Sequence, residues 1–80
     1  MSGYLGTISY EPDSGWLYEG DVYLEEVKPG KFEFRVEVEC SNDRTYQIIL
    51  EKAVWEYADY IDRAIEQGNS VFADNGEELV

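Results

Sequence analysis

Strict alternation of apolar and charged side chains is the clearest local pattern in the chain, and it covers residues 31–40. The apolar members are Phe32, Phe34, Val36, Val38 and Cys40. Because successive side chains of a β-strand point to opposite faces, the pattern predicts a strand whose even positions face a core. A second predicted strand covers residues 16–27. Pro29 and Gly30 lie between the two, in the order typical of a type II turn, so a hairpin is expected.

Two further strands are predicted on either side of this hairpin. The first covers residues 4–10 and is weaker because Gly6 interrupts it. The second covers residues 45–50, where Tyr46, Ile48 and Leu50 are predicted to face the core and Thr45, Gln47 and Ile49 the solvent. Together the strands predict an antiparallel meander.

From residue 51 the apolar spacing changes to that of a helix. Over residues 51–67 the apolar side chains fall on one helical face, which is predicted to cover the sheet. Gly68 follows the last periodic residue and marks the end of the helix. In residues 69–80, the apolar piece Val71-Phe72-Ala73 is predicted to dock on the domain, and the acidic end to fray.

These elements predict an α+β fold: a four- to five-stranded antiparallel sheet, built as a meander, with one C-terminal amphipathic helix packed on one face. Eighty residues, 44% of them hydrophobic, suffice for one domain over residues 1–80. The strand order stays open, because strand 4–10 fits either side of the meander. The core is small, so Phe34→Ala or Ile61→Ala is expected to cost about 2 to 5 kcal/mol.

The charge balance narrows the choice of partners. The chain has 18 acidic residues, 6 basic residues and no histidine, which gives a formal net charge of −12. Such a charge repels nucleic acids and anionic membranes, so direct binding to either is not expected. No segment approaches the roughly 18 apolar residues of a membrane span, and the first residues lack the features of a signal peptide. A soluble, cytoplasmic protein is expected.

Most enzyme classes are disfavoured by missing residue types. Without histidine, and with Cys40 as the single cysteine, the chain offers neither a Ser-His-Asp nor a Cys-His arrangement. A pair of catalytic carboxylates is conceivable, but accidental pairs are common among so many acids. Glycine-rich phosphate loops and calcium-binding loops are absent too. We expect no catalytic residue, cofactor or metal site, and we expect Cys40 to pack in the core.

Candidate binding residues come from the distribution of negative charge. The outward face of the predicted helix carries an acidic row around a tryptophan: Glu51, Trp55, Asp59, Asp62 and Glu66. The outward face of strand 31–40 carries a second row: Glu33, Glu37 and Glu39. Neighbours in such rows lie about 5 to 7 Å apart, broadly like successive phosphates of a nucleic-acid strand. Two alternatives stay open: the acids serve solubility, or Trp55 turns inward under Val71-Phe72.

In size, acidity and sheet-plus-helix build, the chain resembles the small inhibitors that phages and mobile elements use against host defences, including anti-CRISPR proteins and DNA mimics. The resemblance is compositional and covers the whole chain. It implies a non-catalytic inhibitor that blocks the basic surface of a nucleic-acid-handling protein, such as a nuclease. The helix carboxylates would then pair with Lys or Arg, the three strand glutamates would widen the contact, and Trp55 would be the anchor.

Two other functions fit the same sequence. An immunity protein or antitoxin would neutralise a basic toxin through the same electrostatics. A small accessory domain would instead self-associate through an edge strand, residues 45–50 or residues 4–10, with its acidity serving solubility. The expected state is a monomer or a weak homodimer.

Overall fold

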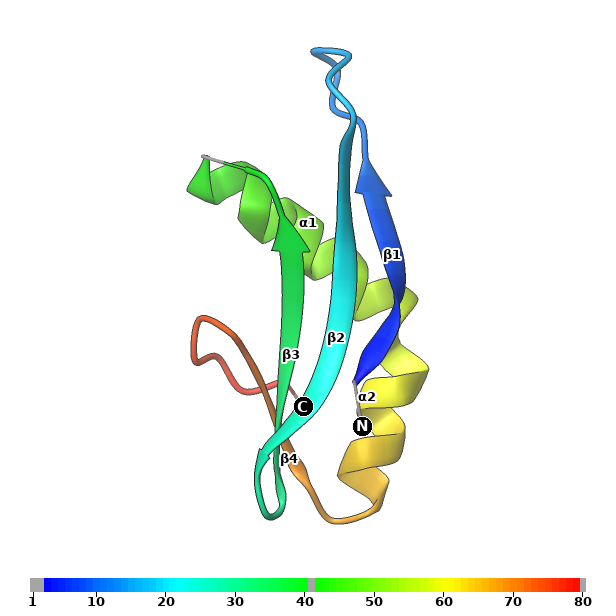
Figure 1. The fold of residues 1–80 in the computed structure, drawn as a ribbon, viewed down its shortest axis with the longest axis vertical. Helices are drawn as coiled ribbons and strands as arrows, with labels where there is room; N and C mark the ends of the chain where they lie inside the picture. The colour runs from blue at the N-terminus through cyan, green and yellow to red at the C-terminus, as the bar shows by residue number, and fades with distance from the viewer. Residues whose placement is uncertain (1–2, 41, 80) are drawn as a thin grey trace.

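A computed structural model describes residues 3–40 and 42–79. The elements in chain order are β1 (Tyr4–Tyr10), β2 (Tyr18–Lys28), β3 (Lys31–Val38), α1 (Asp43–Glu56), α2 (Ala58–Glu66) and β4 (Ser70–Ala73). The strands form one sheet in the order β1-β2-β3-β4, and the helices cover one of its faces (Figure 1). The α+β class is therefore confirmed.

Strands β1, β2 and β3 form the predicted antiparallel meander. Lys28 is paired with Lys31, so Pro29 and Gly30 alone connect β2 to β3. Gly30 has a φ of 80°, the left-handed conformation that the second central position of a type II turn requires. The predicted hairpin is confirmed.

The fourth strand makes the sheet mixed rather than antiparallel, which corrects the predicted fold class. β4 pairs with β3 in parallel, with Val71 opposite Phe32 and Ala73 opposite Phe34. The chain reaches β4 through both helices, a crossover long enough for parallel pairing. The predicted fraying is also wrong for the described part of the tail, because the Leu79 N–H donates to the Val71 carbonyl at 2.8 Å and the Leu79 side chain packs against the core. Val80 lies outside the described residues.

The predicted strand over residues 45–50 is wrong, because this segment belongs to α1. The Asn42 side chain caps the helix by accepting hydrogen bonds from the backbone N–H groups of Arg44, at 2.9 Å, and Thr45, at 3.2 Å. Ile49 is 1% exposed and Ile48 is 38% exposed, the reverse of the strand prediction. A six-residue segment is too short to distinguish the two-residue period of a strand from the 3.6-residue period of a helix. The apolar repeat that continues to residue 53 has the helical period. Ser41, part of the polar turn expected there, lies outside the described residues.

Two helices replace the single helix predicted over residues 51–67. They meet at Tyr57, whose φ of −111° and ψ of 23° leave the helical region. Hydrogen bonding continues across the break, because the Tyr57 N–H donates to the Ala53 carbonyl and the Ile61 N–H to the Tyr57 carbonyl. The chain therefore bends at Tyr57 while Ala53 and Ile61 both stay buried against the sheet, as predicted.

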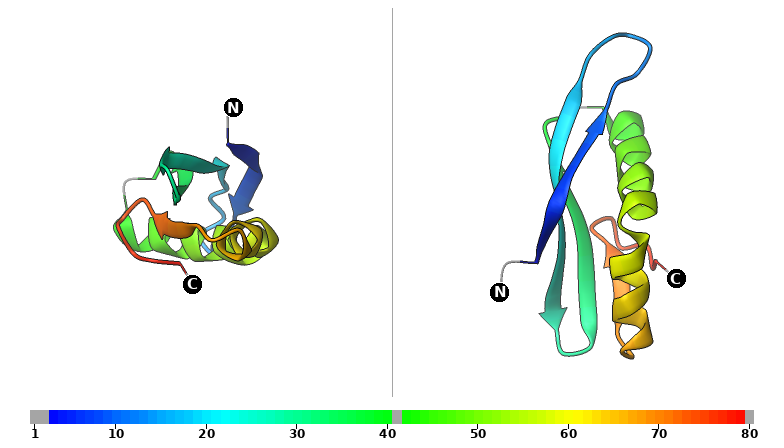
Figure 2. Two further views of the ribbon diagram at one scale, coloured as in Figure 1. Left: turned by 90° about the horizontal axis from the view of Figure 1, so that it is seen from below. Right: turned by 90° about the vertical axis from the view of Figure 1, so that its right-hand side faces the viewer.

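Sheet and helices form two layers with the core between them (Figure 2). Val22 and Phe34 are 0% exposed at its centre. The even positions of β3 face the helices, as predicted, and its odd positions lie on the uncovered face of the sheet. The predicted core position of Cys40 is wrong, because β3 ends at Val38 and Cys40 is partly exposed beyond it, outside the core cluster. The molecule therefore offers two broad surfaces, one formed by the helices and the other by the open sheet.

Candidate protein-binding surface

The predicted acidic row on the helices, here called the helix ridge, is exposed along both helices. It comprises Glu51, Trp55, Asp59, Asp62 and Glu66. Trp55 is 84% exposed, so the alternative in which it turns inward is excluded. Glu51 and Trp55 lie one turn apart on α1, and the bend at Tyr57 separates them from the three carboxylates on α2.

The ridge carboxylates carry charge that the chain itself does not neutralise. Among residues 3–40 and 42–79, the only ion pairs join Arg35 to Glu25 and to Glu37. Lys52, on α1, instead donates a hydrogen bond to the Ser9 carbonyl of β1. The ridge therefore presents free carboxylates around an exposed aromatic ring.

The second predicted row does not share a face with the ridge. Phe34 and Val36 point from β3 towards the helices, so Glu33 and Glu37 lie on the opposite face of the sheet. Glu39 follows the end of β3 and lines the same hollow as Glu37. The structure thus separates the two acidic rows into two surfaces.

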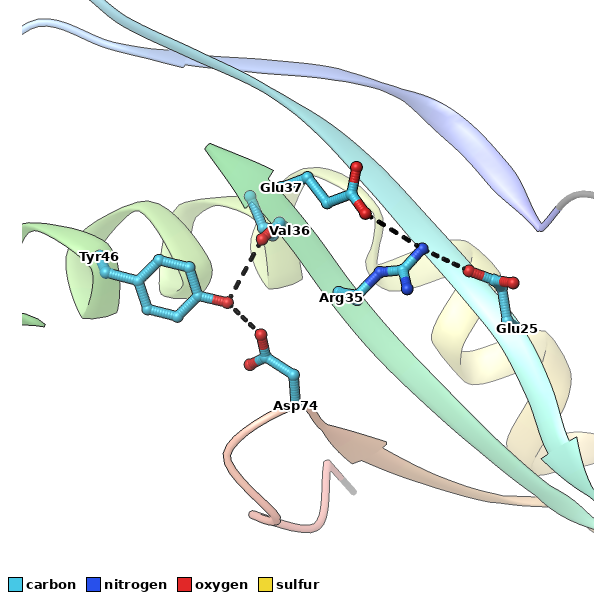
Figure 3. A network of polar contacts seen from close by, with 6 residues as sticks. All are labelled: Glu25, Arg35, Val36, Glu37, Tyr46 and Asp74. Atoms are coloured by element: carbon cyan, nitrogen blue, oxygen red, sulfur yellow. Dashed lines mark hydrogen bonds and ion pairs between the residues drawn. The ribbon is translucent and has the colours of Figure 1, made fainter. Parts of the chain in front are cut away.

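Arg35 reduces the charge of the sheet surface (Figure 3). Its guanidinium donates to Glu25 at 2.6 Å, lies 3.5 Å from Glu37 and sits 4.7 Å from the centre of the Tyr23 ring. These groups are partly exposed, so each ion pair contributes about 0 to 1 kcal/mol to stability. Glu37 is therefore engaged within the chain, unlike the ridge carboxylates.

A hollow of about 940 Å³ is lined by residues of β1, β2 and β3 together with Tyr46 of α1 and Asp74. The carboxylates in its lining are Glu19, Asp21, Glu37, Glu39 and Asp74. Glu19 and Asp21 are not among the predicted binding residues, although their alternation along the strand indicates a shared face. Within the described part of the chain, no group of three or more acidic or cysteine side chains is arranged to hold a metal ion.

Tyr46 forms one wall of this hollow and fixes the C-terminal segment. Its hydroxyl contacts the carboxylate of Asp74 and the carbonyl of Val36, the latter at 3.4 Å (Figure 3). Burial, and then the hydrogen bond donated to Asp74, raise the pKa of Tyr46 well above its usual value. The hydrogen bond from Tyr46 to the Val36 carbonyl also occupies the edge of β3 past Phe34, where its pairing with β4 ends.

The free edge of β1 is covered by side chains from the helices. The Tyr57 hydroxyl donates to the Thr7 carbonyl at 2.7 Å, and Lys52 donates to the next outward carbonyl, that of Ser9. Such cover limits strand pairing with a second molecule. Residues 45–50, the other edge proposed for a homodimer, are helical. The edge predicted over residues 45–50 is therefore absent, and pairing through β1 stays a prediction.

No protein-family model, curated protein or solved structure matches the chain. In the part of the chain that the structure describes, neither helix is long and apolar enough to cross a membrane. The charge, shape and exposure of the surfaces themselves are therefore what indicates a function.

Proposed function

We propose that the protein is a non-catalytic inhibitor that uses the helix ridge to block a basic surface of a nucleic-acid-handling protein. One observation carries this proposal: Trp55 is 84% exposed among carboxylates that have no ion-pair partner within the described residues. Tryptophan is strongly favoured at the centre of protein interfaces, where its large ring is removed from water.

Electrostatics supports a basic protein as the partner. The net charge of −12 attracts a cationic surface over long range and speeds association at low ionic strength. The same charge disfavours direct binding to nucleic acid, which is itself a polyanion.

The spacing of the ridge carboxylates supports a partner whose basic surface normally binds the phosphates of a nucleic acid. Asp59, Asp62 and Glu66 follow one another at intervals of three and four residues on α2. Side chains at these intervals lie about 5 to 6 Å apart, comparable to successive phosphates. A groove whose Lys and Arg side chains bind a nucleic-acid strand would accept such a row, as expected for an inhibitor of the anti-CRISPR or DNA-mimic kind.

Affinity capture from a host lysate, with washes at low and moderate salt, tests this function. We expect the wild type to recover a nuclease or another nucleic-acid-binding protein, and competing DNA or RNA to displace it. The Trp55→Ala variant should no longer capture this partner. The Trp16→Ala variant, in which a second tryptophan that is 64% exposed is replaced, should still capture it. Equal capture by both variants, or a partner that nucleic acid does not displace, would contradict the proposal.

A further inference from the structure

A groove lies between the helices and the C-terminal segment, which run side by side in Figure 2. It consists of three adjoining hollows of about 320, 310 and 200 Å³, and Leu79 lines all three. Trp55 and Leu50 line the first hollow, Ala58 and Ile61 the second. One end of the groove therefore lies beside the exposed tryptophan of the helix ridge.

The groove combines an apolar floor with an acidic rim. Val54 is shared by the first two hollows and lies between Leu50 and Ile61, both of which are 4% exposed. The carboxylates lining the hollows are Glu51, Asp62, Glu77 and Glu78. Among the described residues, no Lys or Arg lines any of the three.

We propose that this groove binds an amphipathic, basic helix of the partner protein. The inference rests on the proposed function and specifies the chemistry of the contact. Apolar side chains spaced along one face of such a helix would fill the hollows, and its flanking Lys or Arg side chains would pair with the rim. Trp55 would close over one end of the bound helix.

An extended peptide fits this groove less well, because the neighbouring strand edge is already occupied. β3 pairs with one side of β4, and on the other side the Val71 carbonyl accepts the N–H of Leu79 at 2.8 Å. Phe72 and Glu78 form an antiparallel bridge at the same edge. An incoming strand would have to displace this segment before it could pair with the sheet.

Two synthetic peptides of identical composition test the inference. One is a helix with Leu on one face and Lys on the other, and the second is the same set of residues scrambled so that the faces mix. In a Trp16→Phe background Trp55 is the single tryptophan, so its emission reports on the groove. We expect the amphipathic peptide to shift Trp55 emission to the blue and to bind about tenfold more tightly than the scrambled one. Equal affinities would overturn the groove as a helix site, whereas the capture experiment above would still test the ridge as a basic-protein site.

A matched pair of variants locates the binding. Gln47 is exposed and lines the first hollow, and Gln67 is exposed but lies outside the groove, at the end of α2. Gln47→Lys should lower the affinity for the amphipathic peptide several-fold, because it places a cation at the rim. Gln67→Lys should leave this affinity within about twofold of the wild-type value. Ala58→Leu, which adds volume in the second hollow, should weaken binding without adding charge. If Gln47→Lys and Gln67→Lys weaken binding equally and Ala58→Leu has no effect, the peptide does not occupy the groove.

Discussion

The exposed fraction of a side chain separates the residues that hold this fold from those available to a partner. Phe34 is 0% exposed, and Phe34→Ala removes its transfer free energy and leaves a cavity, so we expect a loss of about 3 to 5 kcal/mol in the free energy of unfolding. Trp55→Ala should change it by less than about 0.5 kcal/mol, because the ring contributes little to the core. Urea unfolding of both variants measures the contrast. A large loss for Trp55→Ala would show that the ring has a structural role instead.

Tyr46 predicts a specific dependence of stability on pH. Its pKa is raised in the folded protein, first by burial and then by its hydrogen bond to Asp74. A raised pKa means that the stabilisation is complete below the unfolded pKa of about 10 and is lost as the pH rises through the folded value. Above about pH 10, urea midpoints should therefore fall more steeply for the wild type than for Tyr46→Phe. Parallel slopes would show that the hydroxyl is not held in this way.

At the scale of the elements, Gly6 and Tyr57 couple the edge strand to the bend between the helices. Gly6 has a φ of 155° at an irregularity in β1, and a Cβ built there would lie 2.5 Å from the Tyr57 hydroxyl oxygen. Gly6→Ala should destabilise the fold by about 1 to 3 kcal/mol. The loss should be smaller in a Tyr57→Phe background, where the hydroxyl is absent. A double-mutant cycle from urea unfolding measures this coupling, and additive effects would contradict the contact.

The elements that the sequence predicted well are those whose pattern is long or whose turn is chemically distinctive. Strict alternation and the Pro29-Gly30 turn gave the β2–β3 hairpin correctly. Residues 45–50 fit a strand by local alternation, but the Asn42 N-cap and the helical repeat that continues to residue 53 make them part of a helix. The parallel pairing of β4 depends on where two helices return the chain, which local spacing does not encode.

The same limit applies to the candidate site. The helical spacing of the ridge residues correctly predicts that they are exposed, and they remain exposed on both sides of the bend at Tyr57. Its separation from Glu33 and Glu37 follows from which face of the sheet the helices cover, and that is a property of the tertiary packing. The groove beside Leu79 was missed because the last residues were expected to fray.

At the scale of the whole molecule, the shape is elongated, with dimensions of 41 × 21 × 19 Å, so surfaces at its two ends lie far from each other. The loop between β1 and β2 projects at one end, and α2 lies towards the other (Figure 1). Acidic residues occur at both ends, so net charge alone would attract a basic partner in many orientations. Binding through the helix ridge requires, in addition, that the ridge carboxylates and Trp55 direct the approach of the partner.

The association rate of the captured partner, measured at low and moderate salt, tests that requirement most directly. Asp59→Lys/Asp62→Lys and Glu11→Lys/Asp13→Lys change the net charge equally, but the first pair lies on α2 and the second in the β1–β2 loop. We predict a rate that falls with salt, and a reduction of about tenfold or more at low salt for the α2 variant, with a much smaller effect of the loop variant. Equal rates for the two variants, or an α2 variant as fast as the wild type, would contradict binding through the helix ridge.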